Sequence, residues 1–115
     1  MQIPKPTPAD FERFRSAVPD DPRVAVKPMF GNLGAFVNGN MFMGLFGADI
    51  GVKLAPGDAE ILLAVEGAGP FGPAERPMGG YVTLPGALVG TPGGDRWTTA
   101  ALTHVGSMPP KAPTK

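Results

Sequence analysis

The sequence contains no cysteine and only one histidine, His104. Without cysteine the chain forms no disulfide, has no thiolate nucleophile and cannot hold zinc through sulfur, and one histidine cannot build a multi-histidine metal site. A catalytic triad would have to use His104, but neither serine, Ser16 nor Ser107, lies in the G-x-S-x-G context of an activated nucleophile. We therefore expect no enzyme activity, no metal and no cofactor.

Net charge and long apolar runs are also missing. Ten lysines and arginines balance ten aspartates and glutamates, so no overall field attracts a phosphate backbone, and direct nucleic-acid binding is disfavoured. No run approaches the roughly 20 apolar residues of a membrane span, and the start of the chain lacks the apolar core of a signal peptide. We expect a cytoplasmic protein without a membrane partner.

The length bounds the number of domains. A chain of 115 residues has room for one domain with one modest core, because domains commonly run to about 100–150 residues. We expect a single domain over residues 1–107, while the composition of residues 108–115 is typical of a disordered tail.

The central feature is a glycine-rich stretch over residues 27–54, which holds four of the seven phenylalanines. Within it, Asn38-Gly39 separates two apolar runs, and this dipeptide favours the positive φ angles of a two-residue type I′ turn. The stretch therefore predicts a β-hairpin at the centre of a sheet.

A hairpin centred on Asn38-Gly39 determines which side chains share a face of the sheet. Val37 is then opposite Asn40, Phe36 opposite Met41, Ala35 opposite Phe42, and Gly34 opposite Met43. One face carries Phe36, Met41, Met43 and Leu45, and the other carries Ala35, Val37, Phe42 and Phe46. Both faces are apolar, yet the helices of a two-layer domain cover only one. We expect a homodimer through the second face; the alternative is a strongly twisted sheet that its own chain covers on both sides.

The remaining elements follow from local signals. Thr7-Pro8 begins a helix that Pro19 ends, Pro56 opens a second helix that ends near Glu66, and Asp95 opens a third. Alternation predicts strands at residues 24–27, 49–54 and 78–85, with loops at 67–77 and 86–94. The fold class is α+β: a two-layer domain with an antiparallel sheet of about four to five strands and flanking helices.

The loop at 67–77 contains a literal match to the dinucleotide fingerprint G-x-G-x-x-G, from Gly67 to Gly72. The fingerprint needs a strand before it and a helix after it. Here a helix precedes it, and Pro70 and Pro73 prevent an immediate helix. We interpret the match as a plain loop.

Candidate binding residues gather in the hairpin and at strand ends. The methionines and phenylalanines could line a ligand pocket or an adaptable partner surface, although core and dimer packing is the favoured use. Lys27, Lys53 and Arg76 could converge on an anion; scattered solvated charges are the simpler interpretation. The possible interface or pocket consists of Met29, Phe30, Phe36, Met41, Phe42, Met43, Lys53, Arg76 and Tyr81.

The hairpin carries a resemblance to a known family. Met29-Phe30-Gly31, followed by Gly34, Phe36, the Asn38-Gly39 turn and Met41-Phe42, resembles the N-terminal domain of the TfoX/Sxy competence-regulator family. Those domains show an arginine, then Met-Phe-Gly-Gly, a short aromatic strand, a glycine turn and another Met-Phe-like strand.

Two later segments agree with the resemblance. Residues 52–54 (VKL) are similar to the family's strand before its second helix, and residues 76–85 (RPMGGYVTLP) are similar to its closing strand. The resemblance covers residues 11–104. Two positions depart from it, since Lys27-Pro28 replaces the family's arginine and Asn32 replaces its second glycine, so any role of that arginine is in doubt here.

The resemblance implies an α+β two-layer fold, often dimeric, with no enzyme activity. Full-length members regulate natural competence genes, working with a cyclic-AMP-dependent activator at promoters, and carry a second, helical C-terminal domain. We expect a stand-alone N-terminal-like domain that regulates transcription through protein-protein contacts, with a homodimer and a transcription-factor partner. The alternative is a small-molecule binding or enzymatic protein with a Met/Phe-lined pocket and Lys53, Arg76 and Tyr81 at its rim.

Overall fold

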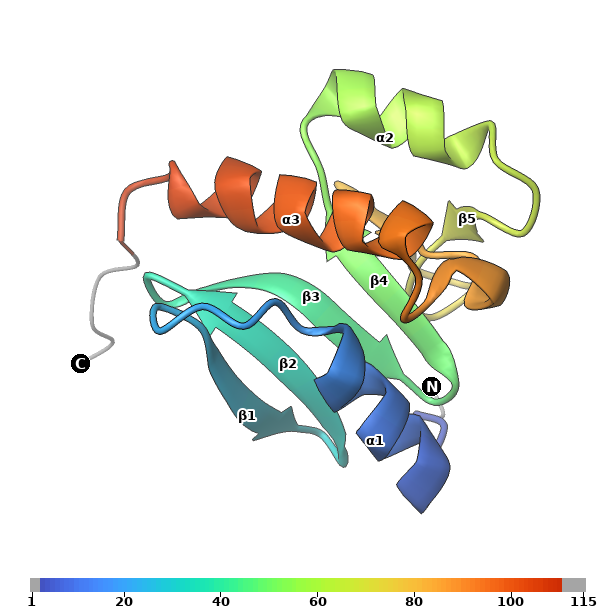
Figure 1. Cartoon of the computed structure of the whole chain (residues 1–115). Helices are drawn as coiled ribbons and strands as arrows, with labels where there is room; N and C mark the ends of the chain where they lie inside the picture. Colours follow the sequence, from blue (N-terminus) through green and yellow to red (C-terminus); the bar gives the residue numbers. More distant parts are fainter. Residues whose placement is uncertain (1–2, 111–115) are drawn as a thin grey trace.

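The computed structural model describes residues 3–110 and contains an antiparallel sheet of six strands in the order β1-β2-β3-β4-β6-β5 (Figure 1). The α+β prediction is confirmed. The sheet has one strand more than the expected four to five, because Gly69–Pro70, in a stretch that composition assigns to a loop, pairs with β6. The elements are α1 (Pro8–Ala17), β1 (Ala25–Met29), β2 (Asn32–Val37), β3 (Asn40–Phe46), β4 (Asp49–Lys53), α2 (Pro56–Leu63), β5 (Gly69–Pro70), β6 (Tyr81–Thr83), a 3-10 turn (Gly86–Leu88) and α3 (Pro92–Gly106).

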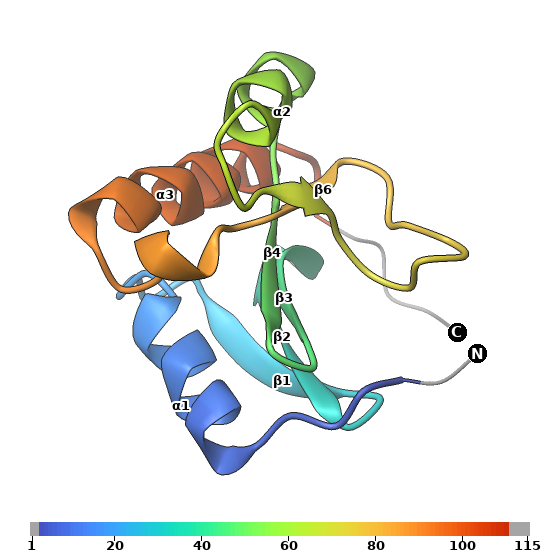
Figure 2. The ribbon, with the colours of Figure 1, turned by 90° about the vertical axis from the view of Figure 1, so that its right-hand side faces the viewer.

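The two sides of the sheet are covered differently. Helices α1 and α3 pack on one side of β1–β4, which we call the inner face (Figure 2). The segment between β5 and β6 and the start of the chain lie on the opposite side, the outer face. The core lies between the inner face and the helices. It includes Leu33, Ala35, Val37, Phe42, Met43, Leu45, Ile50, Val52, Val82, Phe14, Trp97, Ala101 and Val105.

Helix starts follow the capping rules. The Thr7 side chain accepts a hydrogen bond from the Asp10 backbone N–H (3.2 Å), and the Asp10 carboxylate accepts one from the Thr7 N–H (2.8 Å). The Thr7 backbone hydrogen bond holds the pKa of Asp10 below its usual value. Helix α3 begins at Pro92, three residues before the predicted Asp95, because Thr91 caps it in the way that Thr7 caps α1.

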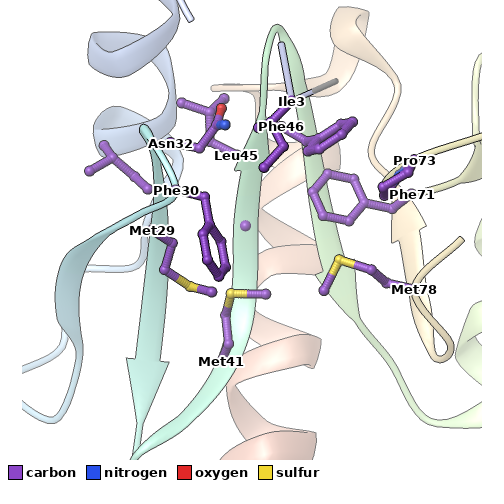
Figure 3. Close-up of a pocket in the computed structure, with 12 residues that line it drawn as sticks. Ile3, Met29, Phe30, Asn32, Met41, Leu45, Phe46, Phe71, Pro73 and Met78 are labelled. Carbon is purple, nitrogen blue, oxygen red and sulfur yellow. The ribbon is translucent and has the colours of Figure 1, made fainter. Parts of the chain in front are cut away.

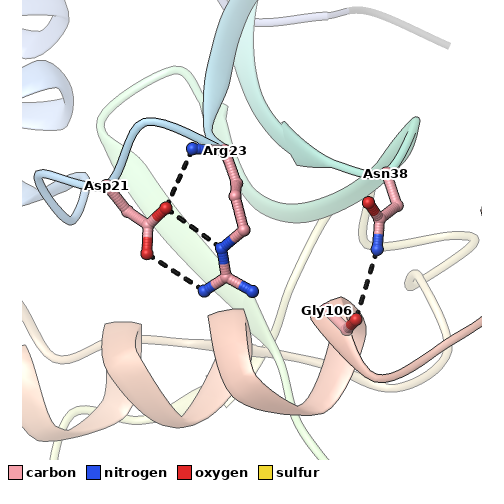
Figure 4. Close-up of polar contacts among 4 residues, drawn as sticks. All are labelled: Asp21, Arg23, Asn38 and Gly106. Carbon is pink, nitrogen blue, oxygen red and sulfur yellow. Dashed lines mark hydrogen bonds and ion pairs between the residues drawn. The ribbon is translucent and has the colours of Figure 1, made fainter.

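The predicted Asn38-Gly39 turn is confirmed. The φ angles are 54° at Asn38 and 78° at Gly39, and Val37 pairs with Asn40. The Asn38 side-chain amide also donates to the carbonyl of Gly106 (3.2 Å), which ties the turn to the end of α3 (Figure 4). Asparagine therefore serves both the turn geometry and a tertiary contact.

A β-bulge alters the predicted pairing beyond the turn. Phe36 pairs with Met41 as expected, but Ala35 pairs with Met43 and Gly34 with Gly44. Phe42 is the extra residue, and a shift of one residue moves every later side chain to the other face. The predicted faces are therefore wrong for the second half of β3: Met43 and Leu45 belong to the core, and Phe46 lies on the outer face with Phe71.

Strand β1 and the turn before it also follow local chemistry. Strand β1 is an edge strand, which is one of the two places, an edge or a bulge, that Pro28 favours, since proline cannot donate to a sheet ladder. Before it, the Asp21 carboxylate accepts hydrogen bonds from the backbone and guanidinium of Arg23, with an ion-pair distance of 3.0 Å (Figure 4). These hydrogen bonds lower the pKa of Asp21 and hold the turn before β1, in which the Val24 N–H donates to the Asp21 carbonyl.

The predicted tail begins within the described part of the chain. Met108 packs against the core, and the Asn40 amide donates to the carbonyl of Pro109 (3.1 Å), so contacts continue past residue 107. Residues 111–115, the rest of that tail, lie outside the described residues. Within residues 3–110, none of the helices combines the length and the apolar character that a bilayer crossing requires.

Candidate functional site

Three glycines form a row across the outer face. Gly34, Gly44 and Gly51 lie on β2, β3 and β4 and pair directly with one another. Because no side chain rises from this row, larger side chains lie flat on the sheet backbone. The ring of Phe71 occupies the space above Gly51 and is 2% exposed, and the sulfurs of Met29 and Met41 lie 3.0 and 2.9 Å from the position of a Cβ at Gly34.

A cavity of about 370 Å³ opens on this face, and we call it the recess (Figure 3). Met29 and Phe30 of the β1–β2 hairpin form one wall. The opposite wall comes from the segment between β5 and β6. Its residues are Phe71, Pro73 and Met78. The rest of the lining consists of Ile3, Asn32, Leu33, Met41, Gly44, Leu45 and Phe46.

Asn32 is the polar side chain of the recess, and both polar atoms of its side-chain amide form hydrogen bonds within the chain. Its Nδ2 donates to the carbonyl of Pro4 (3.2 Å), and its Oδ1 accepts from the N–H of Gly47 (2.8 Å). This side chain, at the position where the sequence departs from the family pattern, therefore fastens the start of the chain and the β3–β4 turn to the sheet. The remaining lining can bind apolar groups but offers little to a polar ligand.

Tyr81 lies half-buried beside the recess. Its hydroxyl donates to the carbonyl of Met41 (2.8 Å), and its ring lies 6.1 Å from that of Phe71. Burial raises the pKa of Tyr81 to about 12. The phenol is therefore neutral at physiological pH and holds β6 to β3 rather than exchanging protons.

The three cationic side chains that could have bound one anion together lie apart from one another. The Nζ atom of Lys27 lies 5.5 Å from the ring centroid of Phe36, and that of Lys53 lies 5.6 Å from the centroid of Tyr81. Strands β2 and β3 separate these lysines, so they lie about 14 Å apart at the usual strand spacing. Arg76 is exposed in the loop before β6. Scattered charges, the simpler interpretation, fit these positions.

The predicted site residues divide between the recess and the core. Met29, Phe30 and Met41 line the recess, whereas Phe42 and Met43 are fully buried in the core and cannot line it. Phe36 is half-buried on the outer face beneath Lys27, and Lys53 and Tyr81 lie beside each other.

The wall formed by Phe71, Pro73 and Met78 was missed by the sequence reasoning. The stretch was interpreted as a plain loop because of its glycines and prolines. The one available signal was Phe71, a large apolar residue in an otherwise Gly/Pro-rich segment, since such a residue usually needs a packing partner.

Fold and site together define a small α+β domain whose antiparallel sheet carries its core on one face and an apolar recess on the other. The chain matches the family model of the TfoX N-terminal domain over residues 17–105, which is most of its length. It belongs to the TfoX N-terminal domain family. Neither the comparison with curated proteins nor the comparison with solved structures found a match.

Proposed function

We propose that this chain is a regulatory domain without enzyme activity that acts through protein-protein contacts in the control of transcription, in a process related to competence. The observation that carries the proposal is the outer face. It presents an apolar recess to solvent, with Phe30 at its edge 80% exposed. Apolar surface that a domain leaves open commonly marks a protein-protein contact site.

The chemistry of the recess supports a binding role rather than catalysis. General acid–base catalysis needs a titratable group within reach of the reacting atoms. Here the Asn32 amide is engaged with backbone groups, and the Tyr81 phenol donates to a backbone carbonyl. Among residues 3–110, no three His, Cys, Asp or Glu side chains come close enough to hold a metal ion.

The proposed partners are a second copy of this chain and a transcription factor, in the cytoplasm. Balanced charge supports self-association, because two copies without net charge are not driven apart by a long-range field. The same balance opposes direct DNA binding. We therefore propose that the chain reaches a promoter through another protein.

The test is affinity capture of the tagged chain from its own host after mild cross-linking, with mass-spectrometric identification. We expect reproducible recovery of a transcription factor or RNA polymerase, which is absent from a parallel capture with an unrelated tagged domain of similar size. Recovery of this chain alone from both growing and competence-inducing cultures would contradict the regulatory role.

A second candidate is small-molecule binding, which the recess volume favours. A cavity of about 370 Å³ lies within the range of roughly 300–1,000 Å³ that is typical of ligand sites. Thermal unfolding against a panel of apolar metabolites separates the two candidates, since a ligand at 100 times its Kd stabilises the native state by about 2.7 kcal/mol. The regulatory proposal expects no rise in Tm with any compound; a rise of several degrees would favour the second candidate.

A further inference from the structure

Three of the six methionines, Met29, Met41 and Met78, line the recess. The sulfurs of Met29 and Met41 lie 3.0 and 2.9 Å from one point, the position of a Cβ at Gly34, so they are neighbours above a bare strand. Met78 approaches from the opposite wall, and the ends of the three side chains gather at one end of the recess (Figure 3). We call these three side chains the thioether cluster.

Each member of the thioether cluster comes from a different segment whose backbone is held in place. Met29 ends β1, and Met41 lies on β3, where its carbonyl accepts from the Tyr81 hydroxyl (2.8 Å). The N–H of Met78 donates to the carbonyl of Phe71 (2.9 Å), which folds the segment between β5 and β6 back over the sheet. A methionine side chain keeps three rotatable bonds. The sulfurs can therefore adjust to one shared guest on a fixed frame.

Apolar packing alone does not explain sulfur at three positions of one cavity. Leucine, isoleucine and valine fill much of the core, and within residues 3–110 Met43 is the one methionine that is fully buried there. Sulfur differs from a methylene group in its polarisability and its lone pairs, which make a thioether a soft metal ligand. The recess thus gathers ligand atoms of one chemical kind.

Phe30 provides a second, independent observation. The turns Asn38-Gly39 and Phe30-Gly31 have the same shape, with φ angles of 54° and 78° and of 50° and 80°. Asparagine suits the first position, whereas a bulky residue is disfavoured at positive φ, and strain of this kind is concentrated at functional sites. The strained turn places the Phe30 ring, which is 80% exposed, at the recess (Figure 3). Because an aromatic face attracts a cation within about 6 Å of its centroid, this ring favours a positively charged guest.

We propose that the thioether cluster binds the soft monovalent ion Cu(I), with Met29, Met41 and Met78 as ligands and the Phe30 ring beside the ion. Thioethers suit Cu(I), whereas Mg²⁺ and Ca²⁺ require oxygen ligands and zinc sites use imidazole, thiolate or carboxylate. Among residues 3–110, the lining of the recess includes no carboxylate and no imidazole. The expectation of no metal rested on cysteine and histidine, which a thioether site does not need.

The first experiment adds Ag(I), a redox-inert analogue of Cu(I), to the untagged wild-type chain in chloride-free buffer, with ¹³C-methyl methionine labels. We expect the resonances of Met29, Met41 and Met78 to shift until one ion is bound per chain. Met43 should stay unchanged, because it is fully buried in the core. Unchanged recess resonances at millimolar Ag(I), or shifts confined to Met108, would overturn the proposal.

The second experiment measures Cu(I) affinity by anaerobic competition with a chromophoric chelator for wild type, Met41→Leu and the control Met43→Leu. Both replacements conserve volume, so both variants retain the fold. We expect Met41→Leu to raise the Cu(I) Kd at least about tenfold, since even the outer-shell partners of metal ligands commonly change affinity by 10–100-fold. Met43→Leu should leave the Kd unchanged. Equal Kd values for wild type and Met41→Leu would overturn the site.

The inference goes beyond the proposed function and does not depend on it. Leucine at position 41 keeps the recess apolar, so affinity capture with Met41→Leu should recover the same partner as wild type. Failure of capture with wild type and Met41→Leu, while wild type binds Cu(I), would contradict the regulatory role alone. Recovery of the partner by a wild-type chain that binds neither ion would overturn the metal site alone.

Discussion

Replacement of Phe42 by alanine is expected to lower the free energy of unfolding by about 3–5 kcal/mol, the usual cost of removing a fully buried phenylalanine. Phe42 is the extra residue of the β3 bulge, and its side chain is fully buried in the core that also contains Phe14 and Trp97. The cavity cannot collapse easily because it lies between a sheet and two helices. Urea denaturation followed by tryptophan fluorescence measures the loss.

The matched control is Met43→Leu, the adjacent residue of the same strand, which is also fully buried. A volume-conserving substitution of this kind commonly costs less than about 1.5 kcal/mol. A loss below about 1 kcal/mol for Phe42→Ala would contradict the burial of this side chain between the sheet and the helices, because an exposed or loosely packed phenylalanine gives an effect of that size.

The second large effect is expected for Gly51→Ala. A methyl group at Gly51 would overlap the ring of Phe71, which lies directly on the β4 backbone. Phe71 is nearly buried, so its ring must shift and expose apolar area. Overpacking of this kind costs about 1–3 kcal/mol, and we expect the upper end because a rigid ring is displaced. The same urea denaturation measures it.

Gly44→Ala provides the comparison, because Gly44 pairs directly with Gly51 on the neighbouring strand. Its Cβ would lie 3.3 Å from the terminal methyl of Met41 and 3.4 Å from the edge of the Phe71 ring. A flexible methionine end moves easily, so the expected loss is less than about 1 kcal/mol. Equal losses for the two alanine variants would show that the ring of Phe71 does not rest on Gly51.

The parts of the fold that local chemistry determines could be predicted from the sequence. The capped start of α1, the Asn38-Gly39 turn and the edge position of Pro28 each depend on a few neighbouring residues. The bulge at Phe42 could not be predicted, because an apolar residue at this position satisfies either register. Packing against α1 and α3, a contact distant in sequence, determines the register instead.

The residues of the candidate site also divide into those that the sequence could predict and those that it could not. Met29, Phe30 and Met41 were within reach of sequence reasoning because they belong to the apolar side chains of residues 27–54, which the sequence places at the centre of the sheet. The wall that includes Phe71 was not, because its position depends on the missing side chain of Gly51, 20 residues earlier in the chain. A glycine that makes room for a distant ring is indistinguishable in sequence from one that permits a bend.

The central claim is that the outer face is the contact surface, and methionine-methyl NMR tests it most directly. With ¹³C-methyl methionine labels, Met29, Met41 and Met78 report from the recess, while Met43 lies in the core and the half-buried Met108 packs against it. We predict that the three recess resonances shift as protein concentration rises from micromolar to millimolar, while the resonances of Met43 and Met108 stay unchanged. Constant recess resonances, or shifts confined to Met43 and Met108, would contradict the account.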